Sequence, residues 1–234
     1  MTHWTRRLAR LLLTPVLYLA AAVVAWTAFA LPVRVDRHLG LLPAGLGFAA
    51  TLVLFVCGRR FVRLYVFGHE LTHWLAAKLF RRRTGRLRVG RHSGSVEVED
   101  PNAIIVLAPY IVPVYTLMVT GAYGVVRFLV EPFPAWGIAG FSAALGSPYA
   151  FHLDLTGLSL RYGRQDLRLC GPVFSIGLIL LGNLALIFLA LVVAGRHWDT
   201  ALPLLGRHSL TVWSTLVEAG RSVWREAQRW LAGR

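Results

Sequence analysis

Long blocks of apolar residues dominate the chain and restrict its fold more than any other feature. The blocks cover residues 11–32, 41–58, 61–80, 103–126, 135–151 and 171–195. About 20 helical residues cross a hydrocarbon core roughly 30 Å thick, so apolar stretches of this length are typical of membrane helices. Only 15% of the 234 residues are charged, whereas a soluble domain has roughly a quarter. The pattern predicts an all-α polytopic membrane protein with five or six membrane segments.

Positive charge gathers at the ends of these apolar blocks. The chain has 25 basic and 11 acidic residues, for a formal net charge of +14. Nucleic-acid-binding proteins share such an excess, but here no basic segment is separated from the apolar blocks as a binding domain would be. Arginine clusters beside membrane helices are typical of cytoplasmic loops. We therefore expect no nucleic-acid partner, and expect a multi-pass protein in the lipid bilayer of a prokaryotic cytoplasmic (inner) membrane.

The polar stretch 81–102 has a different pattern. Apolar and polar residues alternate in two short runs, 87–89 and 96–98, and residues 91–94 between them are typical of a turn. This alternation predicts a small β-hairpin. Because a strand edge exposed to lipid leaves backbone groups unpaired, we expect the hairpin at the membrane interface or inside a protein cavity.

The C-terminal residues 209–231 place apolar side chains near helical spacing and arginines on other faces. Such a pattern is typical of a basic amphipathic helix that lies on a membrane surface. We therefore divide the chain into a membrane-embedded domain, residues 1–208, and an amphipathic surface helix, residues 209–234.

The sequence His69-Glu70-Leu71-Thr72-His73 lies in the apolar block 61–80, which contains no proline and favours a helix. On a helix, His69 and His73 project from the same face and can bind one zinc ion at about 2.0–2.1 Å. Glu70 is placed to act as the general base toward water. The five-residue pattern also occurs by accident in soluble helices. Ionisable groups inside an apolar segment, however, are costly unless paired or metal-bound, which favours a functional zinc centre.

A catalytic zinc site needs a third protein ligand and an open position. The downstream candidates are His92, His152, Asp154 and Asp166. His92 belongs to the arginine-rich hairpin turn, and we interpret it as solvated. Asp166, just before the block at 171–195, is the preferred ligand; otherwise it is a helix N-cap. Asp154 is the alternative, and His152 could be a ligand or could hydrogen-bond to substrate or to the catalytic carboxylates.

Three further features lie outside this motif. Asn183, in the last apolar block, either hydrogen-bonds between helices or approaches the site. The stretch from Pro109 to Pro113 either opens a helix to line a cavity or kinks it for packing. The hairpin at 85–98, which includes Val96, offers an edge on which an unwound substrate could pair as an added strand. Proline at Val96 would break that strand.

The order of these elements resembles the site-2 protease class of intramembrane zinc metallopeptidases. The segment HELTHWLAAKLF lies on an apolar helix and is followed by a polar hairpin, further apolar blocks and a late Asp before a final block. The resemblance covers roughly residues 60–195. It implies that the two histidines bind zinc, that Glu70 is the catalytic base and that a late Asp is the third ligand. The usual late Asp-Gly pair is replaced by Asp154-Leu155 and Asp166-Leu167, as in a divergent member.

We therefore expect a zinc-dependent intramembrane endopeptidase that cleaves membrane-protein substrates, in particular a transmembrane helix, within or near the bilayer. The alternative is a non-enzymatic metal-binding membrane protein, either an inactive peptidase homologue or an assembly factor. Its metal site would be closed by four protein ligands. A metal transporter would carry several ligands along a path, whereas this chain has one cluster. Replacement of Glu70 by Gln separates enzyme from structural protein, because only the enzyme depends on a base.

Overall fold

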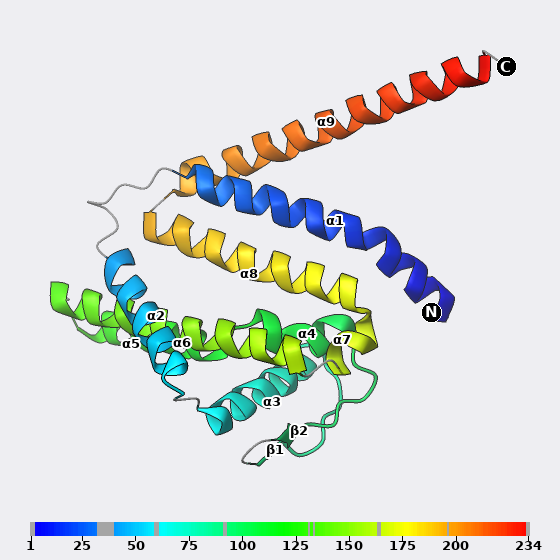
Figure 1. Ribbon diagram of the computed structural model, residues 1–234. Helices are drawn as coiled ribbons and strands as arrows, with labels where there is room; N and C mark the ends of the chain where they lie inside the picture. Colours follow the sequence, from blue (N-terminus) through cyan, green and yellow to red (C-terminus); the bar gives the residue numbers. More distant parts are fainter. Residues whose placement is uncertain are drawn as a thin grey trace. The chain divides into compact units, whose positions relative to one another are not determined.

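A computed structural model describes residues 3–31, 40–58, 61–90, 93–130, 132, 134–162, 165–195 and 197–232. Within these ranges the chain forms nine α-helices and one two-stranded antiparallel sheet (Figure 1). It divides into two compact units, Met1–Val33 with Leu180–Arg234, and Arg34–Ile179. The predicted histidine motif and both candidate aspartates lie in the second unit.

The first unit contains α1 (His3–Ala30), most of α8 (Pro172–Gly195) and α9 (Trp198–Ala232). α1 and α9 are joined by a hydrogen bond of 3.0 Å between Thr27 Oγ1 and His208 Nδ1. A cluster of buried apolar residues in this unit contains Leu31, Val192 and Ala201. The C-terminal residues predicted as a helix are helical, but α9 begins earlier, at Trp198. The predicted domain boundary at residue 208 therefore lies inside one continuous helix.

Two helices are long and apolar enough to cross a membrane, through the stretches Arg7–Ala30 of α1 and Pro172–Val193 of α8. A third span results only if α4 (Ala103–Ile111) and α5 (Val114–Leu129) count as one, and they are bent by 68°. Over the described part of the chain this makes two spans, or up to three, which fits a membrane protein. It is fewer than the five or six segments predicted from the sequence.

The number of spans is lower than predicted because three apolar blocks do not form spanning helices, each for its own reason. α2 (Leu41–Val56) has 16 residues and is about 24 Å long, shorter than a hydrocarbon core. α3 (Val62–Leu79) carries the charged and titratable residues of the histidine motif. α6 (Ala135–Tyr162) continues well past the predicted end at residue 151, into the polar segment expected as a connection. Counting apolar blocks therefore overestimates the number of spanning helices.

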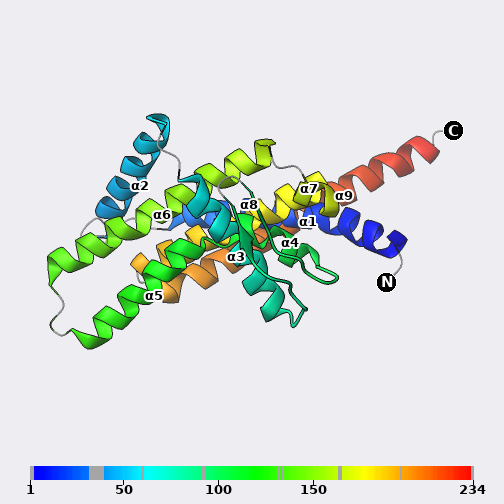
Figure 2. The ribbon, with the colours of Figure 1, turned by 90° about the horizontal axis from the view of Figure 1, so that it is seen from below.

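In the second unit, α2 and α6 pack closely through small residues. A Cβ at Gly47 would overlap the Ala143 carbonyl oxygen, and a Cβ at Gly146 would overlap the Ala44 carbonyl oxygen. Glycine at these two positions lets the helix backbones approach, as small residues do between membrane helices. α5 runs beside α6 in both views (Figure 2).

A small hairpin follows α3 and packs against it (Figure 1). Its strands β1 (Arg88–Val89) and β2 (Gly94–Ser95) pair in antiparallel register, with Val89 opposite Gly94. An isolated bridge between Thr84 and Val98 extends the pairing. The predicted hairpin is confirmed, but its second strand lies earlier than predicted: Gly94, expected in the turn, belongs to β2, whereas Val96 follows the end of β2.

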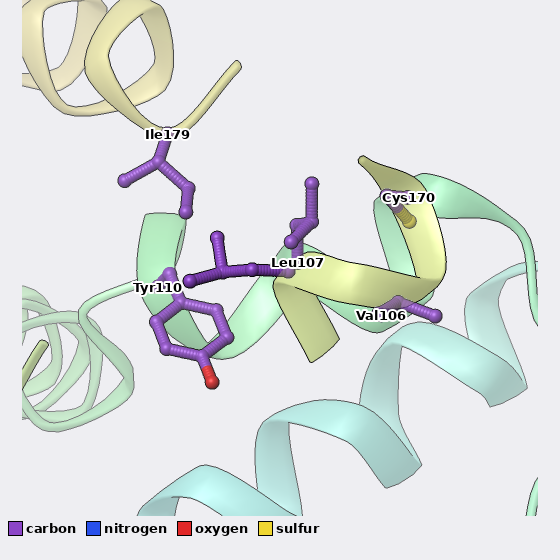
Figure 3. Packing of buried hydrophobic residues seen from close by; sticks show 6 residues of the cluster. Val106, Leu107, Tyr110, Cys170 and Ile179 are labelled. Carbon is purple, nitrogen blue, oxygen red and sulfur yellow. The ribbon is translucent and has the colours of Figure 1, made fainter. Parts of the chain in front are cut away.

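The core of the second unit is built around α4. Asn102 caps this helix, since its side chain accepts a hydrogen bond of 2.9 Å from the Ile105 amide. Pro113, which has no amide hydrogen, follows the end of α4 and prevents its continuation. Buried residues of α4 pack on α7 (Gln165–Cys170) and on the start of α8 (Figure 3). The cluster consists of Val106, Leu107 and Tyr110 from α4, Leu167 and Cys170 from α7, and Ile179 from α8. This packing brings α7 next to α3.

Candidate metal centre

Three side chains converge where α3 and α7 meet. One ligand atom each of His69, His73 and Asp166 lies within 4.8 Å of the other two. Asp166 Oδ2 is 3.7 Å from His69 Nε2 and 4.0 Å from His73 Nε2. Ligand atoms around a tetrahedral zinc ion lie about 3.3 Å apart, given metal–nitrogen distances of about 2.0–2.1 Å. Small side-chain movements would close the observed spacing to that value.

The two histidines are held by hydrogen bonds on the far side of each ring. His73 Nδ1 donates to the Ile105 carbonyl at 2.9 Å, and His69 Nδ1 is 3.2 Å from the Tyr65 hydroxyl. The Tyr65 hydroxyl also contacts Ser159 Oγ. These bonds leave both Nε2 atoms facing Asp166, the arrangement typical of metal-binding histidines. Burial lowers the pKa of His73, and the neighbouring His69 acts in the same direction, so the neutral ring that a metal requires is favoured.

Asp166 lies in the first turn of α7, and not at its N-cap as the alternative interpretation had it. The Tyr110 hydroxyl donates a hydrogen bond of 2.8 Å to Asp166 Oδ2. Burial alone would raise the pKa of this carboxyl group. Together, the interactions with His69, Tyr110 and His73 outweigh burial and hold the pKa below its ordinary value, so Asp166 is a carboxylate at neutral pH.

Glu70 lines the same cleft as the three clustered residues. Burial raises the pKa of Glu70, and the charge of Asp166 acts in the same direction. The Val96 amide donates a hydrogen bond to the Glu70 carboxylate, which ties it to the hairpin. Glu70 is not one of the three clustered residues. Glu70 therefore lies in the cleft beside the cluster without belonging to it.

The cleft has a volume of about 560 Å³ and is bounded by α3, the hairpin, α4 and α7. Polar and apolar groups both line it. With this volume the cleft is large enough for several residues of a peptide. Glu70 and the three clustered residues line it, so a bound peptide would contact them.

The other predicted site residues lie elsewhere. His152 and Asp154 are both on α6 and outside the cluster, although His152 lines a small pocket together with His69. The structure thus brings Asp166, and not Asp154, to the histidines. His92 lies outside the described residues. Asn183 is buried in the first unit, and its role at the site stays a prediction.

Sequence reasoning missed Tyr65, Ser159 and the role of Tyr110. Tyr65 precedes His69 by one helical turn, so helical spacing could have found it. Ser159 and Tyr110 reach the site from α6 and α4, and no local pattern indicates this. The stretch from Pro109 to Pro113 fits both of its interpretations: Tyr110 lines the cleft, and the chain bends by 68° between α4 and α5.

Fold and site together define a mostly helical protein with two or three helices apolar enough to cross a membrane and a candidate centre of two histidines and one aspartate. No family model matches the chain, and no curated protein or solved structure matches it either. The arguments for its function therefore come from its own residues.

Proposed function

We propose that this chain is a zinc-dependent intramembrane endopeptidase, similar to the site-2 protease class. The observation that carries the proposal is the convergence of His69, His73 and Asp166, with Glu70 in the same cleft. The two histidines come from one local motif, but Asp166, the third residue of the cluster, comes from a helix almost a hundred residues later in the sequence. Such a convergence of metal-binding side chains is more specific than the five-residue motif alone.

The donor set fits zinc. Two imidazoles and a carboxylate form a ligand set of catalytic zinc enzymes. Each of the three side chains also has a hydrogen-bond partner outside the cluster: Tyr65 for His69, the Ile105 carbonyl for His73 and Tyr110 for Asp166. Within the described ranges the cluster has three members, which leaves a fourth position for water or substrate. A structural site would have four protein ligands. This difference supports the enzyme over the non-enzymatic alternative.

The proposed reaction is hydrolysis of a peptide bond. When bound, a zinc ion supplies Lewis acidity and lets water lose a proton near neutral pH. The Glu70 carboxylate takes up the proton from the attacking water and returns it to the leaving amine nitrogen. The raised pKa of Glu70 suits this exchange, because a general base works best when its pKa lies closer to the operating pH.

The substrate of the proposed enzyme is a membrane protein, in particular a transmembrane helix. α1 and α8 are the segments that we place across the bilayer. Backbone hydrogen bonds lock the amides of a helical substrate, so the substrate must unwind before attack. In the cleft an unwound segment lies beside the hairpin, whose backbone can pair with it.

The first test is the zinc content of the purified protein. We expect one zinc per chain in the wild type and in Asp154→Ala, and close to none in His69→Ala and Asp166→Ala, because each of the latter removes one of three ligands. Elemental analysis by mass spectrometry measures this. Asp154 is the matched control, an aspartate of the same unit outside the cluster. A wild type that takes up no zinc, or a loss of zinc only in the Asp154 variant, contradicts the proposed centre.

The second test concerns the hairpin. We expect Val96→Pro to lower turnover at least about 10-fold with zinc content unchanged, because proline removes the amide that donates to Glu70. Val96→Ala keeps the amide and is expected to stay within about 2-fold of the wild type. Both rates are measured on a labelled transmembrane peptide in proteoliposomes. If Val96→Pro cleaves as fast as the wild type, the hairpin has no part in catalysis.

A further inference from the structure

The structure assigns a positioning role to Tyr110: we propose that its hydroxyl orients the Asp166 carboxylate toward the two histidines and so sets the affinity of the site for metal. This inference rests on the proposed zinc centre, and it adds a residue that no pattern in the sequence indicates.

The hydrogen bond of Tyr110 falls on the oxygen by which Asp166 faces the cluster. The hydroxyl donates to Asp166 Oδ2 at 2.8 Å, and the same Oδ2 lies 3.7 Å from His69 Nε2 and 4.0 Å from His73 Nε2. A carboxylate oxygen has two lone pairs, so one can accept the hydrogen bond while the carboxylate still faces a cation. Rotation of the carboxylate away from the histidines would break this bond.

Tyr110 is itself held firmly, which lets it position another side chain. Its side chain is 1% exposed and packs in the core with Leu107 and Ile179. In Figure 3 the hydroxyl oxygen points away from these two residues and toward α3. The ring also meets the His69 ring edge-on, with centroids 5.3 Å apart and an interplanar angle of 85°. The same tyrosine thus contacts one histidine and the aspartate of the cluster.

Asp166 needs such support because of where it lies. α7 has only six residues, and a helix this short is not stable alone. Its buried residues Leu167 and Cys170 fix α7 to the core, while the Asp166 side chain reaches into the cleft and is 25% exposed. Core packing therefore fixes the backbone of α7, and the Tyr110 hydroxyl fixes the direction of the carboxylate. Outer hydrogen-bond partners of metal ligands act in this way.

The test is Tyr110→Phe, which removes one oxygen and keeps the ring. We expect its zinc dissociation constant to rise about 10–100-fold, measured by competition with a chromophoric chelator in detergent. The visible spectrum of the cobalt(II)-loaded protein is expected to change as well, because the coordination geometry loosens. The melting temperature of the metal-free protein checks that the variant remains folded.

Tyr149→Phe is the matched control, since the Tyr149 hydroxyl is buried in the same unit and has no hydrogen-bond partner in the described part of the chain. We expect wild-type affinity and spectrum from it. Equal zinc affinity and equal cobalt spectra in the wild type and Tyr110→Phe overturn the positioning role and leave the zinc centre intact. A wild type that binds neither ion overturns the proposed function itself. The two failures are therefore distinguishable.

Discussion

Glu70→Gln is expected to reduce peptide hydrolysis roughly 10²–10⁴-fold, the range that general acid–base catalysis contributes, while zinc content stays at the wild-type level. Glutamine has the size and helix preference of glutamate but cannot accept the proton of the attacking water. Since Glu70 stands outside the three clustered residues, its replacement leaves every proposed ligand in place. Turnover of a labelled transmembrane peptide and elemental analysis of the same preparation measure the two quantities.

Glu97→Gln is the matched control for this experiment. Glu97 is a glutamate of the same unit that follows β2, is exposed and does not line the cleft, so wild-type turnover is expected. Unchanged hydrolysis in Glu70→Gln would remove the proposed base. A wild type that holds zinc but cleaves no peptide, with Glu70→Gln indistinguishable from it, would favour the non-enzymatic metal-binding protein.

The part of the site that could be predicted from the sequence is the part held by one helix. His69 and His73 are four residues apart on α3, and helical geometry alone puts both rings on one face. The observed rings lie 4.9 Å apart between centroids. Glu70 follows from the same geometry, because it is the neighbour of His69 on the helix that bounds the cleft.

The third residue of the cluster is brought to the histidines by packing between distant segments, so the sequence alone left two candidates. Asp154 follows the apolar block 135–151, Asp166 precedes the block 171–195, and both are followed by Leu. What separates them is that α6 continues through Asp154, whereas Asp166 lies in the first turn of a new short helix whose buried residues pack on α4. Neither the extension of α6 nor the contact of α7 with α4 has a local signal. For the same reason Tyr110 could not be linked to Asp166.

The fold was predictable at the level of element type, and the hairpin was found from its alternation. The number of membrane segments was overestimated, because an apolar block need not coincide with one straight helix. The block 103–126 shows this, since Pro113 divides it into two helices bent by 68°. Conversely, the polar residues after 151 were expected to form a connection, and they continue α6 by another eleven residues.

Gly94→Ala is expected to lower turnover roughly 100-fold, the cost that a catalytic group displaced by about 1 Å can have. A Cβ at Gly94 would lie 2.6 Å from Glu70 Cγ and 2.7 Å from Val66 Cγ1. Such distances force a shift, and Glu70 is the group nearest to the added atom. Zinc content is expected to be unchanged, because none of the three nearest atoms belongs to the clustered residues. The same peptide assay and elemental analysis measure both.

Gly157→Ala is the control for this substitution, since a Cβ at Gly157 has nothing within 4 Å and alanine is the better helix former by about 1 kcal/mol. We expect full turnover from it. The double variant Val66→Ala/Gly94→Ala tests the steric cause, because it removes the second of the two close contacts and gives the hairpin room to move off Glu70. Partial recovery of turnover is expected. Wild-type turnover in Gly94→Ala alone would mean that catalysis does not depend on where the hairpin holds Glu70.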